Sequence, residues 1–92
     1  MTDFEELQQL VAFQQFGMLS AAADELHITQ PTMTRSMRKL ERELGVPLFD
    51  RSAKNRIALT PTGELAAEEA RKLLESYEYF LEKNTERCEA RQ

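Results

Sequence analysis

The chain has 92 residues, of which 41% are hydrophobic, so it holds enough apolar side chains for one core and too few residues for two. No stretch approaches the roughly 20 apolar residues that span a bilayer, and the acidic start lacks the basic segment of a signal peptide, so we expect a cytoplasmic protein. Its single cysteine, Cys88, has no intrachain partner for a disulfide or a zinc site.

The charge is distributed unevenly along the chain. The net charge of −4 by itself disfavours nucleic acid, because phosphate binding requires Lys and Arg. However, residues 29–60 carry seven bases and three acids, whereas residues 1–28 carry five acids and no Lys or Arg, and residues 61–92 carry five bases and eight acids. A basic middle between acidic ends indicates a localised surface for an anionic partner.

Two helices are predicted before residue 29. The first runs from a cap at Thr2 or Asp3 to Gly17, which is a typical residue after a helix end. Its expected buried face comprises Phe4, Leu7, Leu10, Val11 and Phe13. The second, shorter helix covers Ser20–Leu26, with Ala22, Ala23 and Leu26 facing inward. His27 follows in a tight connection, where it tolerates a left-handed conformation better than most residues, and it has no co-ligand or triad partner that would indicate chemistry.

The third helix has the most informative pattern. Thr29 is its expected cap, Pro31 fits its first turn, and it runs to Leu44 before Gly45. At about 100° per residue, one side gathers Met33, Met37, Leu40 and Leu44. The opposite side gathers Pro31, Thr32, Arg35, Arg38, Lys39 and Arg42, with no acid among them. A basic stripe that begins with short polar side chains at a helix N-terminus is typical of a helix that enters the major groove. Chance segregation on a solvated face is the alternative.

A small hairpin is predicted next, because Pro47 opposes helical continuation. Leu48–Arg51 and Arg56–Leu59 are its expected strands, joined by a turn over residues 52–55. Arg51, Lys54 and Arg56 lie in or beside this turn. These cations suit phosphate or minor-groove contact, and a turn that merely favours solubility is the alternative.

The last helix is predicted to begin after a cap at Thr60, with Pro61 in its first position, and to continue to about Cys88. Gly63 is expected to weaken it slightly. An apolar stripe at 4-3-4-3 spacing follows, widened by two leucines: Ala66, Ala70, Leu73, Tyr77, Phe80, Leu74 and Leu81. The helix is longer than a domain of about 60 residues can cover, so we expect it to form a dimer interface. Packing on its own domain explains only its first turns.

The sequence has no pattern typical of an enzyme. It contains no carboxylate pair, Cys/His cluster or glycine-rich phosphate loop, so we expect no catalytic residues, no metal site and no cofactor. A DNA-binding regulator accounts for the basic stripe, the hairpin and the last helix together. A dimerisation or decoy module that pairs with a longer relative accounts for the last helix alone.

Three segments carry a family resemblance. They are LSAAADELHITQPTMTR at residues 19–35, LERELGVPLFDR at residues 40–51 and LTPTG at residues 59–63. Together they resemble the amino-terminal domain of LysR-type transcriptional regulators, in one register without a gap over residues 4–75. The resemblance implies a mainly α fold with a winged helix-turn-helix of three helices and a two-stranded wing over residues 1–60. A dimerisation linker helix follows over residues 61–92.

The resemblance also implies roles for individual residues. Two linker helices would pair antiparallel and hold two DNA-binding units over an interrupted inverted repeat. Positions similar to Gln30, Pro31, Thr32 and Arg35 approach bases in the family, those similar to Thr29, Thr34, Arg38, Lys39 and Arg51 contact the DNA backbone, and the wing reaches toward the minor groove. Ala21 departs from the family, where a basic residue is common, so phosphate contact at the second helix is expected from Ser20 alone. The family's ligand-sensing domain has no counterpart here, and we expect this chain alone to bind no small molecule.

Overall fold

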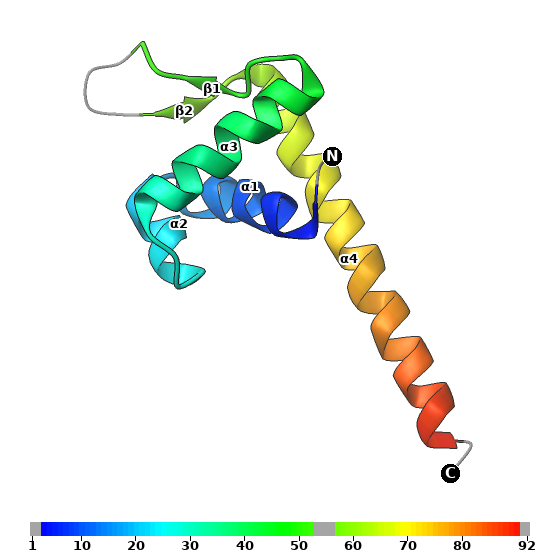
Figure 1. Ribbon diagram of the computed structural model, residues 1–92. Coiled ribbons are helices and arrows are strands. Elements are labelled where there is room, and N and C mark those ends of the chain that lie inside the picture. The colour runs from blue at the N-terminus through cyan, green and yellow to red at the C-terminus, as the bar shows by residue number, and fades with distance from the viewer. Residues whose placement is uncertain (1–2, 53–56, 91–92) are drawn as a thin grey trace.

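The computed structural model describes residues 3–52 and 57–90. In chain order its elements are α1 (Phe4–Phe16), α2 (Leu19–Glu25), α3 (Gln30–Leu44), β1 (Phe49–Asp50), β2 (Ala58–Leu59) and α4 (Pro61–Ala90). The first three helices form the body, the two strands lie beyond α3, and the second half of α4 extends away from the body (Figure 1). This arrangement confirms the expected mainly α fold with a two-stranded wing and a long C-terminal helix.

Short-range signals set most of the helix ends. Asp3 caps α1 and Thr29 caps α3, each accepting the backbone N–H three residues further on, at 2.9 and 3.3 Å. These two helices end at Gly17 and Gly45, which adopt left-handed φ angles of 72° and 73°. His27 has a φ of 59°, as its tolerance for this region predicts. The predicted caps are thus confirmed, and Asp3 rather than the alternative at residue 2 is the cap observed.

The core lies between α1, α2, α3 and the beginning of α4. Its buried hydrophobic residues are Leu10, Ala12, Phe13, Ala22, Ala23, Met33, Met37, Leu40, Leu48, Phe49, Ala67 and Ala70. The predicted inner side of α3 is confirmed except for Leu44, which is 47% exposed because it ends the helix beyond the turns that the other elements cover. On α1, Phe4 is 39% exposed, and its ring packs against Tyr77 of α4 with ring centroids 4.6 Å apart.

The buried face of α1 also holds two polar side chains that the apolar periodicity does not reveal. Glu6 is 3% exposed and Gln9 is 7% exposed. Polar groups at such depth are costly unless they have partners, and the partner of Glu6 is Lys39 of α3.

The wing is shorter than predicted. β1 and β2 pair antiparallel with Phe49 opposite Leu59 and Asp50 opposite Ala58. Leu48 is fully buried just before β1, where its backbone carbonyl accepts the Thr60 N–H at 2.9 Å. The predicted turn residues from 53 onward, and the start of the second predicted strand at Arg56, lie outside the described part of the chain.

The beginning of α4 is clamped against the wing. Thr60 Oγ1 accepts the Gly63 N–H at 2.9 Å and donates to the Pro47 carbonyl at 3.1 Å, so Thr60 caps the helix as predicted. A Cβ atom at Gly63 would lie 2.1 Å from the Leu48 carbonyl oxygen. Gly63 therefore has a packing role in addition to its expected slight weakening of α4, because a hydrogen at this position is what lets the helix approach the wing.

Gly63→Ala should lower the free energy of unfolding by about 3 kcal/mol, because the methyl group forces backbone apart in a packed region. Gly17→Ala is the matched control: it introduces a left-handed alanine with nothing within 4 Å and should cost only about 1–2 kcal/mol. Urea denaturation of both variants measures the difference. Equal losses would show that the contact with Leu48 imposes no additional strain.

α4 has two parts with different surroundings. Ala67 and Ala70 belong to the core, whereas Leu73, Tyr77 and Phe80 further along are 44–59% exposed. The hydrophobic core therefore continues past residue 60 into the first turns of α4. In residues 3–52 and 57–90, no helix combines the length and apolar character that a membrane crossing requires.

Candidate nucleic-acid interface

The solvent side of α3 forms a continuous surface with α2. One shallow depression is lined by Leu19, Gln30, Pro31, Thr34, Arg35 and Arg38. It contains five of the residues predicted to contact DNA, all of them from the part of α3 between Gln30 and Arg38. Short side chains thus stand at the N-terminal end of the helix, with two guanidinium groups beyond them.

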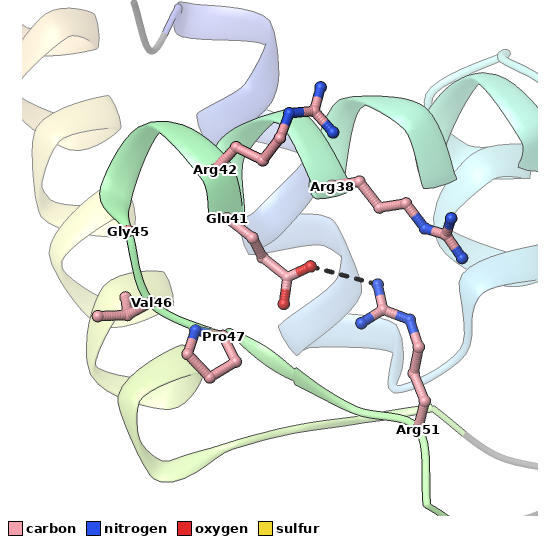
Figure 2. A pocket seen from close by; sticks show the side chains of 7 residues that line it. All are labelled: Arg38, Glu41, Arg42, Gly45, Val46, Pro47 and Arg51. Atoms are coloured by element: carbon pink, nitrogen blue, oxygen red, sulfur yellow. Dashed lines mark hydrogen bonds and ion pairs between the residues drawn. The ribbon is translucent and has the colours of Figure 1, made fainter.

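A second depression continues this surface toward the wing. It is lined by Arg38, Glu41, Arg42, Gly45, Val46, Pro47 and Arg51 (Figure 2). Arg38 and Arg42 extend from α3, and Arg51 extends from the segment after β1 toward Glu41 (Figure 2). Because Arg38 lines both depressions, the α3 residues that line them share one face of the molecule with Arg51, whereas Thr32 and Lys39 line neither depression.

Glu41 joins α3 to the wing. Its Oε2 accepts the backbone N–H groups of Leu48 and Phe49 at 2.8 and 3.2 Å, and its Oε1 lies 3.3 Å from Arg51 Nη2 (Figure 2). The Arg51 guanidinium also lies over the Phe49 ring, 5.7 Å from its centroid. Arg51 is therefore held in place before any DNA arrives.

At about 100° per residue, Glu41 lies on the flank of the basic stripe, and this position alone indicates no role for it. One feature of the sequence does indicate a structural role for Glu41: Gly45 and Pro47 predict a chain reversal, and backbone N–H groups after such a turn need acceptors. A carboxylate one turn before the helix end can supply them. Sequence periodicity alone does not show which N–H groups it reaches.

Hydrogen bonds at the start of α3 organise the predicted base contacts. Thr29 Oγ1 donates to Thr32 Oγ1 at 2.8 Å, and Thr32 Oγ1 accepts a longer bond from Arg35 Nη2 at 3.4 Å. The Arg35 side chain thus turns back toward the N-terminal end of the helix. This hydrogen bond places the Arg35 guanidinium near the short side chains at the N-terminus of α3, where unpaired backbone N–H groups favour anions.

The cations of the stripe are not equivalent. Lys39 Nζ lies 3.0 Å from Glu6 Oε1 and 3.4 Å from Glu43 Oε1, and the hydrogen bond to Glu6 is the main reason that the pKa of Lys39 is raised. Arg38 and Arg42 form no ion pair with the side chains described for residues 3–52 and 57–85. The predicted backbone contacts Arg38 and Lys39 therefore have different surroundings although they are adjacent.

Two parts of the predicted interface are less well defined. Ser20 lies in the first turn of α2 and is half-buried. Lys54 and Arg56, predicted to act at the wing tip, lie outside the described residues.

The predicted dimer residues separate into two groups. Ala70 is 2% exposed in a single chain, so the prediction that it lies in the dimer interface is wrong: its own domain already covers the methyl group. Ala66 is partly buried against the same core. Leu74 is half-buried. The remaining members of the stripe are 44–59% exposed: Leu73, Tyr77, Phe80 and Leu81.

Comparisons with known proteins agree with this architecture. The family model described as "Bacterial regulatory helix-turn-helix protein, lysR family" matches residues 4–64. "HTH-type transcriptional regulator TfdS" of Cupriavidus pinatubonensis is 47% identical over 73 residues, which cover 79% of this chain and 24% of that protein. "Hydrogen peroxide-inducible genes activator" of Dickeya chrysanthemi is 35% identical over 88 residues, which cover 96% of this chain and 28% of that protein. The chain thus spans about a quarter of the length of these relatives.

Solved structures match the fold closely. The chain in the crystal structure of the CbnR_DBD–DNA complex is 34% identical, with a TM-score of 0.87 over 95% of this chain and 99% of that chain. Full-length OxyR C199D from Pseudomonas aeruginosa is 35% identical, with a TM-score of 0.86 over 92% of this chain and 28% of that chain. Because the family model covers α1 through the start of α4 and the relatives named here are transcriptional regulators, the chain belongs to the lysR family of bacterial regulatory helix-turn-helix proteins.

Proposed function

We propose that this chain binds double-stranded DNA sequence-specifically, as the DNA-recognition part of a bacterial LysR-type transcription regulator. The observation that carries the proposal is the continuous exposed face of α3, on which Arg35, Arg38 and Arg42 follow the short side chains of its first turn. The match to CbnR_DBD, solved in complex with DNA, supports DNA as the partner. α3 would enter the major groove while α2 crosses the DNA backbone.

The residues of this face form two groups, those close enough to contact base edges and those placed to contact phosphates. Gln30, Pro31 and Thr32 are at the N-terminal end of α3, which allows close approach to base edges. The Arg35 guanidinium can form two parallel hydrogen bonds to guanine O6 and N7. Arg38 and Arg51, with Thr29, Thr34 and Ser20, would contact phosphates, which fix register without reading sequence. Lys54 and Arg56 at the wing tip would add contacts to phosphates or the minor groove.

We further propose that two copies bind together at an inverted repeat. The exposed part of α4, from Leu73 to Leu81, is too apolar to remain in water along its whole length and would pair with the same segment of a second chain. A dimerisation or decoy module that captures a longer relative would use the same surface. Failure of the isolated homodimer to bind any duplex would favour that alternative.

The role of α3 can be tested with two variants that each remove two positive charges. Arg35→Met with Arg38→Met acts on α3, and Lys72→Met with Lys83→Met acts on α4. Affinity for a random-sequence duplex is measured over a range of salt concentrations. The α3 variant should lower the magnitude of the slope of log K against log salt by about one to two units, because one or two fewer counterions are released. The α4 variant should leave it unchanged. Equal effects would show that binding follows net charge rather than this face.

A further inference from the structure

Lys39 lies on α3, the helix proposed to contact DNA, but its ammonium group is bound to a carboxylate of α1. Its Nζ donates to Glu6 Oε1 at 3.0 Å, across 33 residues of sequence. The Glu6 side chain is 4% exposed, whereas the Lys39 side chain is 47% exposed. The pair therefore joins a buried carboxylate at the start of α1 to a half-exposed stem in the middle of α3.

Glu6 depends on Lys39. Among the side chains described for residues 3–52 and 57–85, Lys39 carries the one basic group within 4.0 Å of this carboxylate, and none of them donates a hydrogen bond to Glu6 Oε2. If Lys39 moved to a phosphate, the ionised Glu6 carboxylate would be left buried and unpaired. The free-energy cost of that state is far larger than the stabilisation from one exposed phosphate contact. Glu43, 3.4 Å from the same Nζ, further reduces the positive charge that Lys39 could offer to DNA.

The pair also favours one orientation of α3 relative to α1. The neighbouring core side chains, such as Leu10 and Met33, are apolar, and apolar contact alone does not favour one orientation over a slightly rotated one. A charge-assisted hydrogen bond does, because it weakens when its distance or angle changes. Glu6 and Lys39 can thus set how α3 sits on the body of the domain.

We infer that Lys39 stays on Glu6 in the DNA complex and is a positioning residue for α3, acting on DNA only through Glu6 and not as a phosphate contact. The inference rests on the proposed function and assigns Lys39 a different role from the one that family resemblance implies. It predicts that removing Lys39 harms binding only while Glu6 keeps its charge.

Four variants test this: Lys39→Met, Glu6→Gln, the double variant Glu6→Gln with Lys39→Met, and Arg38→Met as a control on the same helix. Lys39→Met keeps the apolar stem but strands the Glu6 carboxylate, so the unfolding midpoint at pH 7 should fall by roughly 8 °C or more and affinity for duplex DNA should fall with it. The double variant removes the stranded charge and should recover both, with affinity returning to within about twofold of the unaltered protein. Its salt dependence should match that of the unaltered protein, whereas Arg38→Met should lose about one unit of slope.

Two results would overturn the inference. Recovery of the unfolding midpoint without recovery of affinity would show that Lys39 contacts DNA directly. An unchanged midpoint in Lys39→Met would show that the pair does not hold α3 on α1. If the unaltered protein binds no duplex at all, the proposed function fails and the DNA part of the inference with it, while the unfolding midpoints still decide whether Glu6 and Lys39 are coupled.

Discussion

Replacing Leu73 and Phe80 together with Glu should convert the protein to monomers and lower its affinity for an inverted-repeat site by about 100-fold or more. Both side chains are 59% exposed in one chain, so the substitutions should leave the domain folded. In a dimer they would place four carboxylates in an apolar interface, which opposes association. Two linked DNA-binding units gain about 100- to 10,000-fold in affinity over one, and a monomer loses this gain. Sedimentation and titration with a duplex carrying two half-sites measure both effects.

The control is a second double variant on the same helix. Leu65 and Tyr79 are 70% and 63% exposed but lie more than about 100° around α4 from the middle of the apolar stripe. Their replacement with Glu should leave the dimer and its affinity intact. Tyr77 is less suitable for this test because its ring packs on Phe4 of the same chain. If the unaltered protein sediments as a monomer at tens of micromolar, α4 is not a self-sufficient dimer interface.

Arg35→Ala should weaken binding to the preferred site by about 1–3 kcal/mol and relax the choice of one base pair in each half-site. Arg35 is one turn from the N-terminus of α3, and its hydrogen bond to Thr32 holds it toward that end, where base edges would lie. Removing a contact to guanine affects the preferred sequence more than a random one. The preference for the specific site should therefore shrink.

Arg38→Ala is the comparison, because Arg38 lies nearer the wing and would contact phosphate. It should weaken preferred and random duplexes by similar factors and leave their ratio nearly intact. The test measures the affinities of both variants for the preferred and the random duplex at one salt concentration. If both substitutions reduce affinity uniformly, Arg35 is a phosphate contact, and sequence recognition must depend on Gln30, Pro31 and Thr32.

Features with short-range causes could be predicted from the sequence. Thr29 and the glycines Gly17 and Gly45 act within one turn of the helix ends, so their roles follow from neighbouring residues. The inner side of α3 follows from periodicity, and Met33 and Met37 are buried as predicted. Which residues approach bases and which approach phosphates came from the family resemblance, and their roles remain predictions.

Features with long-range causes could not be predicted. Glu6 meets Lys39 across 33 residues, and Gly63 must be a glycine because the Leu48 carbonyl lies against it. Glu41 serves the wing because the chain turns back over the end of α3. In each case the sequence contains the residue, but its partner is determined by how helices pack. The α1 pattern shows the apolar face and does not distinguish a buried Glu6 from a solvated one.

Selection of bound duplexes from a random-sequence pool tests the central claim most directly. Sequence-specific recognition by the N-terminal end of α3 in two paired chains predicts enrichment of one interrupted inverted repeat. The selected site should bind at least about 1,000-fold more tightly than the starting pool at the same salt concentration. A pool that remains unenriched after several rounds, with all duplexes bound equally, would contradict the claim and leave only non-specific attraction between the basic face and phosphates.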